Sequence, residues 1–318
     1  MYSNQYKMNK KGIFFTLITI VILTIFIITV SISQFQRDDS IVTRVSTMES
    51  FLSSLDKDLE RRTYIFGIRA ILAMDSDILS RLQYINNFDS VVEELFFNAS
   101  INGKLMTNIS TGITYNDTLN EVNFFAKKFN VIVKLGHIDI EMHQDGPWFI
   151  IVNWTINMTL EDISELAKWE RVHSYIAYVS IENFEDPLYI VGTNGSYTNI
   201  IKKTPYEGSY VSGTDVSNLL KHVNKSYYTN FSNAAPSFLD RIKGNIGAKS
   251  PYGIESFVNL ISLSQQGIST KDKTAVDHIY FSSNNPSARK LQGMPSWFKI
   301  DNEDLRETRY NTIGVPNG

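Results

Sequence analysis

The feature that most constrains this chain is an uncharged, strongly apolar run near its start. Residues 12–36 read GIFFTLITIVILTIFIITVSISQFQ and contain no Asp, Glu, Lys or Arg. A helix over residues 13–32 would be about 30 Å long, which matches the hydrocarbon thickness of a bilayer. A cleaved secretory signal has a shorter apolar region and a small-residue cleavage site behind it. The run is longer and no Ala-x-Ala pattern follows it, so we predict a transmembrane helix over residues 13–33.

The charges on either side of this run predict its orientation. Three lysines precede the run and two arginines follow it: Lys7, Lys10, Lys11, Arg37 and Arg44. Cytoplasmic flanks of membrane spans carry the excess of Lys and Arg. We therefore expect a single-pass protein of the cell membrane, with residues 1–12 as a cytoplasmic basic leader and an extracellular C-terminal domain. The lipid bilayer is its first expected partner.

The junction between leader and run carries a short motif, Lys10-Lys11-Gly12 before Ile13. It resembles the class III signal peptide of type IV pilin-like proteins, including the archaeal ones. In that family a prepilin peptidase cuts after the glycine. The resemblance implies that Lys10, Lys11, Gly12 and Ile13 form a processing site, with prepilin peptidase and other pilin-like subunits as partners.

Two positions differ from the pattern of that family. Leu17 stands where bacterial pilins usually carry glutamate as the fifth mature residue, and Ile13 stands where archaeal examples often begin with glutamine. A plain signal anchor, whose last cytoplasmic residues happen to be Lys-Lys-Gly, is the alternative interpretation.

The residues after the run change to the pattern of an amphipathic helix. Apolar side chains recur at intervals of four and three, which places them on one helical face. They are Ile41, Val45, Met48, Leu52, Leu55 and Leu59. No proline interrupts residues 13–75, so we predict a stalk helix over residues 34–75, docked on its own domain, with Gly67 as its weakest point. A parallel coiled coil is the alternative. Because pilins share this arrangement, the resemblance covers roughly the first 60 residues.

Helix signals continue in the first part of the predicted ectodomain, residues 76–200. Asp75-Ser76 can begin a helix that carries Ile78 and Leu82. Two further pairs match the spacing of a capping box, Ser90 with Glu93 and Thr118 with Glu121. We predict that a helix begins at each of these three places.

From residue 131 onward the apolar period drops to two. His137, Asp139, Glu141 and His143 alternate with Ile138, Ile140 and Met142, and two similar runs follow over residues 148–160 and 169–182. Turn residues such as Gly146-Pro147 separate them, which predicts an antiparallel sheet with one covered face. The fold class is therefore α+β.

The C-terminal part, residues 201–318, is less regular. Thr214 is expected to begin a helix, and residues 236–243 read as another short helix. Residues 275–281 read as a strand, and Asp301 can begin a last helix that ends at Arg309. The second half is thus expected to hold short elements joined by loops.

Glycosylation is the main functional signal outside the membrane segment. Asn-x-Ser/Thr sequons occur at Asn98, Asn108, Asn116, Asn153, Asn157, Asn194, Asn224 and Asn230. Such a site needs an exposed acceptor on the secreted side. Asn153 and Asn157 share one face of their predicted strand, so a glycan on either would point into solvent.

Composition and motifs exclude several other kinds of site. The chain has no cysteine, which excludes disulfides and thiolate metal sites, and a net charge of −3 gives no reason to expect nucleic-acid binding. The phosphate-binding and hydrolase motifs Gly-x-Gly-x-x-Gly, Walker A, Gly-x-Ser-x-Gly and His-Glu-x-x-His are absent. The polar face from His137 to His143 carries metal-ligand types, but alternate strand residues lie about 6–7 Å apart. We interpret that face as solvated and predict no metal, no cofactor and no catalytic residue.

The sequence therefore favours a membrane-anchored or filament-associated, pilin-like surface glycoprotein with a structural or adhesion role. An anchored ectodomain that binds or senses a ligand is the alternative, and it would keep its leader. An extracellular hydrolase is the third hypothesis, which would require carboxylates or histidines to converge in a cleft.

Overall fold

The computed structural model of this chain describes residues 10–106 and 111–318, with the side chains of residues 15, 17–34, 41–106 and 111–318. Within these residues the fold combines helices with antiparallel sheets, as the α+β prediction expected, and one apolar helix lies at the N-terminal end. Residues 1–9 of the predicted leader and the sequon at Asn108 lie outside the described residues.

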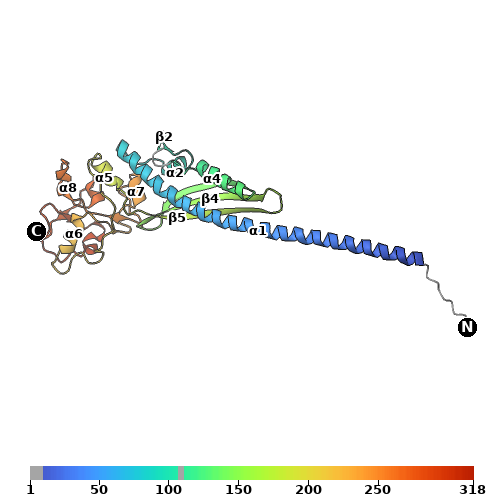
Figure 1. The fold of residues 1–318 in the computed structure, drawn as a ribbon. Coiled ribbons are helices and arrows are strands. Elements are labelled where there is room, and N and C mark those ends of the chain that lie inside the picture. Colours follow the sequence, from blue (N-terminus) through green and yellow to red (C-terminus); the bar gives the residue numbers. More distant parts are fainter. Residues whose placement is uncertain (1–9, 107–110) are drawn as a thin grey trace. The chain divides into compact units, whose positions relative to one another are not determined.

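Helix α1 is a single unbroken helix, Lys10–Arg81, of 72 residues (Figure 1). The separate helix predicted to begin at Asp75-Ser76 is therefore wrong, because α1 continues through these residues. An intrahelical ion pair between Asp77 and Arg81 lies in this last stretch. Leu82 ends the helix with a left-handed φ of 56°, a common way to terminate an α-helix.

The described chain divides into two compact units, each assembled from separate segments. The first contains α1 up to Leu55 together with Val122–Lys134 and Met158–Arg171. In this unit Arg44 pairs with Asp162 at 2.5 Å, and its guanidinium donates to the carbonyl oxygens of Phe129 and Asn130, both at 2.6 Å. The ring of Phe51 lies 5.2 Å from that of Phe129. This part of α1 is thus docked on its own unit.

The second unit contains Asp56–Glu121, Leu135–Asn157 and Val172–Gly318. Here Gly67 of α1 approaches the sheet so closely that a Cβ atom would meet the Cγ2 atoms of Val152 and Val179 at 2.6 and 2.7 Å. The residue predicted as the weak point of the helix is thus a position where α1 packs closely against the sheet.

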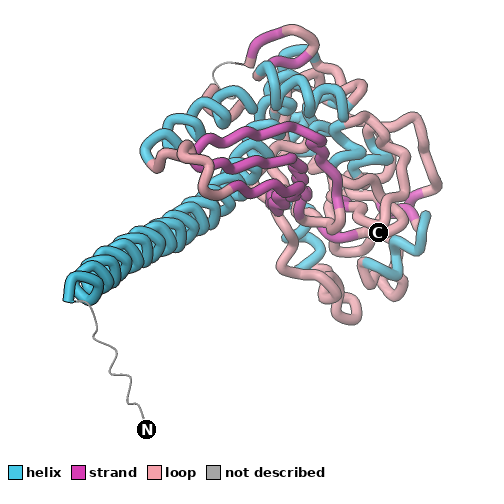
Figure 2. The backbone as a smooth tube through the Cα atoms, turned by 90° about the vertical axis from the view of Figure 1, so that its right-hand side faces the viewer, coloured by secondary structure: helices cyan, strands magenta, loops and turns pink. Residues whose placement is uncertain are grey.

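The main sheet has three strands in the order β3-β4-β5: β3 Val131–Gln144, β4 Phe149–Asp162 and β5 Lys168–Ser180 (Figure 2). All three lie where the period of two predicted strands. In β4 the side chains of Trp154, Ile156 and Met158 are buried. In β3 the buried positions shift phase by one residue after Leu135, so that Ile138 is exposed whereas Ile140 and Met142 are buried. The face that β3 buries therefore changes along the strand.

Two helices precede the sheet, α2 Phe88–Asn98 and α4 Tyr115–Lys128, and the short strands β1 Ser100–Ile101 and β2 Lys104–Leu105 follow α2. Both capping-box predictions are wrong. Helix α2 begins after Asn87 without a side-chain cap, so Ser90 lies inside it. At the start of α4, Thr114 and Asp117 exchange reciprocal hydrogen bonds, which satisfy the first free N–H groups before Thr118.

The rest of the second unit consists of short elements. In chain order they are α5 Pro187–Gly192, α6 Ser217–Asn224, β6 Thr229–Asn230, α7 Phe238–Ile242, β7 Ile254–Glu255, α8 Leu260–Gln265, α9 Asp277–Tyr280, β8 Ala288–Arg289, β9 Ile300–Asp301, the 3₁₀ turn Glu303–Leu305 and α10 Arg306–Arg309. The short helix over residues 236–243 is confirmed. The strand predicted over residues 275–281 is wrong, because this run forms α9, and α6 begins three residues after Thr214.

Candidate functional site

The apolar part of α1 is the first candidate. The window Leu17–Gln34 has a mean hydropathy of 2.4, and none of its side chains is buried. The hydroxyls of Thr19, Thr24 and Thr29 donate to carbonyl oxygens four residues earlier, at 2.8–2.9 Å. These polar groups are thus satisfied within the helix, as a hydrocarbon environment requires. Among the described residues, α1 is the one helix that is long enough and apolar enough to span a membrane.

The predicted processing residues lie at the beginning of the same helix. Lys10 is its first residue, and Lys11, Gly12 and Ile13 continue it. For these four residues the structure describes the backbone only.

The sequons differ in how far their asparagines are exposed. Five are exposed: Asn98, Asn116, Asn157, Asn194 and Asn224. Asn153 and Asn230 are half-buried. The amide of Asn153 donates to Glu141 at 3.0 Å, and its Oδ1 atom is buried. Of the two sequons on the β4 face, Asn157 is therefore the more accessible acceptor.

The polar face of β3 divides between a packed residue and an open cleft. His137 is half-buried, with its ring 4.8 Å from that of Phe97, and burial lowers its pKa. Asp139, Glu141 and His143 instead line a cleft of about 550 Å³. Other lining residues from α2, α7 and nearby loops include Asp89, Glu93, Asp240, Lys243 and Tyr252. Among the described residues no group of three or more His, Asp or Glu side chains is arranged to hold a metal ion.

A buried network of charges occupies the C-terminal half of the second unit, and its first centre is Arg241. One guanidinium nitrogen contacts Asp186 at 2.6 Å and Asp277 at 2.9 Å, and another donates to the carbonyl oxygen of Ile254. Tyr228 donates to Asp186 at 2.8 Å. The two carboxylates raise the pKa of Arg241 against the effect of burial, so this guanidinium stays charged.

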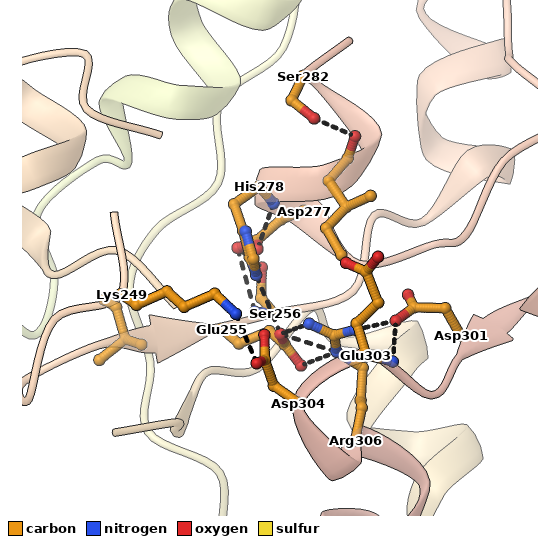
Figure 3. Close-up of polar contacts among 12 residues, drawn as sticks. Lys249, Glu255, Ser256, Asp277, His278, Ser282, Asp301, Glu303, Asp304 and Arg306 are labelled. Atoms are coloured by element: carbon orange, nitrogen blue, oxygen red, sulfur yellow. Dashed lines mark hydrogen bonds and ion pairs between the residues drawn. The ribbon is translucent and has the colours of Figure 1, made fainter. Parts of the chain in front are cut away.

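Glu255 is the second centre of the network. Figure 3 shows it between the ring of His278 and the guanidinium of Arg306, which also contacts Asp301. The Nε2 atom of His278 lies 3.1 Å from Glu255, Arg306 approaches at 2.9 Å, and Tyr310 donates at 3.0 Å. Burial alone would raise the pKa of Glu255, but Arg306 and the hydrogen bond from His278 outweigh it and hold the pKa at about 2.

The two centres are joined through neighbouring residues. Asp277 accepts from both the backbone N–H and the hydroxyl of Ser256, at 3.1 and 2.8 Å, and His278 follows it in α9. The network thus connects loops and short elements between residues 186 and 310. The side chains of Arg241, Asp186, Asp277, Glu255 and Arg306 are all fully buried. Because each buried charge has a buried partner of opposite sign, the arrangement belongs to the interior of the fold.

His222 is a further buried group in this region. Its Nδ1 atom lies 3.0 Å from Thr204, and the rings of Tyr210 and Phe257 lie 5.1 and 5.6 Å away. Its Nε2 atom has no hydrogen-bond partner among the described residues. Burial lowers the pKa of His222 to about 3, so the ring is neutral, and it packs against Tyr210 and Phe257 of the hydrophobic core.

Sequence reasoning predicted only a fragment of this network. Asp301 was expected to begin a helix, and its carboxylate does accept from the backbone N–H of Glu303 at 2.9 Å. Its ion pair with Arg306 was missed, although the two lie five residues apart. No local pattern distinguishes Glu255 or Arg241, because their partners come from distant segments.

Protein-family models, curated proteins and solved structures were each compared with the chain, and none matched it.

Proposed function

We propose that this chain is a membrane-anchored, pilin-like surface protein, with the apolar window of α1 in the bilayer and the folded units outside. The carrying observation is that Leu17–Gln34 is helical, apolar and wholly unburied. Twelve of its 18 residues are Leu, Ile, Val or Phe, and each contributes about −0.3 to −0.6 kcal/mol on insertion. Their sum of roughly −4 to −7 kcal/mol favours insertion of this window into a bilayer.

The basic residues on either side of the apolar window support the proposed orientation. Arg44 is one of the two arginines that follow the apolar window, and its guanidinium is held by Asp162 and two carbonyl oxygens. Arg37 is the other, whereas the leader carries three basic residues close together in sequence, Lys7, Lys10 and Lys11. The charge bias favours a cytoplasmic leader.

The part of α1 that follows the apolar window supports the pilin-like part of the proposal. The same helix that begins with the apolar window buries Met48, Phe51 and Leu55 farther along. Beyond them Gly67 packs against two strands of an antiparallel sheet. A hydrophobic half followed by an amphipathic half docked on a β-rich domain is the arrangement of pilins, which the Lys10-Lys11-Gly12 motif also resembles.

The cleft beside β3 favours a second candidate, an anchored ectodomain that binds a ligand. It is lined by Asp139, Glu141, Asp89 and Glu93, with Lys243 as a cation. A cationic ligand would suit this lining, since opposite charge steers association. This candidate needs the membrane segment but no processing of the leader.

The N-terminus of the mature protein tests between the two candidates. We would determine it by mass spectrometry of purified membranes and of material shed from the cell surface. A start at Ile13 supports pilin-type processing, whereas an intact start at Met1 contradicts it and favours the anchored ectodomain. The variant Gly12→Val should abolish the cut, and the matched control Asn9→Val should leave it unchanged. A cut that persists in Gly12→Val would contradict the assigned processing site.

A further inference from the structure

The first unit carries an exposed patch of aromatic, aliphatic and cationic side chains at the end of α4 and in the β4–β5 turn. Phe124 and Phe125 are 59% and 44% exposed, and Ile163 and Leu166 are 55% and 39% exposed. Lys127 and Lys128 are exposed beside them, and the Nζ atom of Lys128 lies 4.5 Å from the ring centre of Phe124. We call these six residues the aromatic–lysine patch.

Both parts of the patch are fixed to one residue of α1. Arg44 binds the carbonyl oxygens of Phe129 and Asn130, directly after α4, and the carboxylate of Asp162, directly before the β4–β5 turn. The N–H of Ile163 also donates to Asn130 at 3.1 Å, which joins the turn to the end of α4. The patch is therefore held at a defined height along the helix.

That height is close to the apolar window. Arg44 follows Gln34 by ten residues, which corresponds to about 15 Å along a helix. The headgroup layer on one side of a bilayer occupies about 5–8 Å of this distance. Membrane helices tilt by about 20° on average, which brings side chains on one flank of the helix closer to the lipid surface.

The chemistry of the patch matches a lipid surface. Aromatic side chains concentrate at the membrane–water interface, and lysines extend their ammonium groups into the headgroup layer. On the α4 side of the patch, residues 122–134 contain Lys127, Lys128 and Lys134 but no Asp or Glu, whereas the β4–β5 turn carries the exposed Glu165 between Ile163 and Leu166. The positive charge on the α4 side complements anionic headgroups.

We propose that the aromatic–lysine patch rests on the headgroups of anionic lipids beside the apolar window of α1. The inference depends on the proposed membrane span, because only the span brings the patch to the bilayer. Contact of the patch with the lipid surface would give α1 a second point of attachment and fix the direction in which it leaves the membrane.

The absence of cysteine allows a clean test with single-cysteine variants of the full chain. Phe125→Cys would report on the patch, Ile25→Cys on the span and Ile313→Cys on an exposed residue of the second unit. Each would carry a fluorophore in vesicles of phosphatidylcholine and phosphatidylglycerol in equal parts. Spin-labelled lipids, with the nitroxide on the headgroup or on the acyl chain, would serve as quenchers.

We expect the headgroup nitroxide to quench the label at position 125 several-fold more than the label at position 313. The charge reversals Lys127→Glu and Lys128→Glu together should reduce that quenching to the level of position 313. The matched reversals of two exposed neighbouring lysines, Lys202→Glu and Lys203→Glu, should leave it unchanged.

Three outcomes would overturn the inference in distinguishable ways. If position 25 is quenched by the acyl-chain nitroxide but position 125 matches position 313, the span stands and the patch does not contact lipid. If position 25 is not quenched either, the proposed membrane anchor fails as well. If position 125 is shielded from iodide in detergent, and increasingly so as the protein concentration rises, the patch binds a second copy of the chain.

Discussion

The apolar window of α1 and the C-terminal half of the second unit distribute polarity in opposite ways. In Leu17–Gln34 the apolar side chains are all unburied. Between residues 186 and 310 it is charged side chains, among them Arg241, Glu255 and Arg306, that are fully buried. The first arrangement suits an apolar environment outside the helix. The second requires that each buried charge be matched by a partner inside the fold.

The comparison shows that burial and polarity must be considered together. An exposed apolar helix is costly in water and favourable in lipid, whereas a buried charge is tolerated when its partner is also buried. Each region therefore has a characteristic way to fail. A charge placed in the apolar window would make insertion of this helix into lipid unfavourable, and an apolar residue placed in the network would leave a carboxylate unpaired.

The largest effect is expected from Arg306→Met. This change removes the cation that faces Glu255 and Asp301, and an unpaired buried charge costs about 3–5 kcal/mol of unfolding free energy. Urea unfolding of the full chain in detergent would measure it. The exposed ion pair of Arg61 with Asp58 provides the control, since Arg61→Met should cost less than about 1 kcal/mol. Equal losses in the two variants would contradict a special role for burial.

A somewhat smaller effect is expected from Ile25→Arg, at the centre of the apolar window. An arginine there costs about 2.5–3.5 kcal/mol on insertion into a bilayer, so the fraction of the chain recovered with membranes should fall. Quantitative fractionation would measure the change. Ile313→Arg, at an exposed position of the second unit, should have no effect on fractionation. An unchanged membrane fraction in Ile25→Arg would show that this window does not anchor the chain.

The smallest of the three effects concerns pH. The pKa of His222 falls from about 6.5 in the unfolded chain to about 3 in the fold, so the stability it contributes is full above pH 6.5 and declines as the pH falls toward 3. At pH 5 the expected loss is about 2 kcal/mol. Unfolding at pH 8 and pH 5 would measure it. The loss should disappear in His222→Phe and persist in His143→Phe, which alters an exposed ring.

The alternation of apolar and polar residues predicted the three strands of the main sheet, which follow one another in the sequence. The strands β3, β4 and β5 follow from alternation, since buried and more exposed residues alternate over parts of each strand. The helix ends were predicted less well. Ser90 and Thr118 satisfy the spacing of a capping box, but α2 begins at Phe88 and α4 begins beside Thr114. Several residues could supply a cap, and tertiary packing decides which of them does so.

The buried network could not be predicted from local patterns. Glu255 and Arg306 lie 51 residues apart, and Arg241 lies 55 residues from Asp186. Their pairing depends on how loops fold over one another, which a single sequence does not encode at a fixed spacing. The apolar window lies at the other extreme, because its length and composition alone distinguish it.

The close contact at Gly67 also has a mechanical consequence. A residue without a side chain lies between Val152 and Val179, and a Cβ atom there would approach both within 2.7 Å. A slip of α1 by one turn would bring Thr63 or Ile71 to this position, and both are β-branched. The glycine therefore fixes the position of α1 along the sheet, because only a residue without a side chain fits between the two valines. A pull along the helix axis must push these valine side chains apart before the helix can slide.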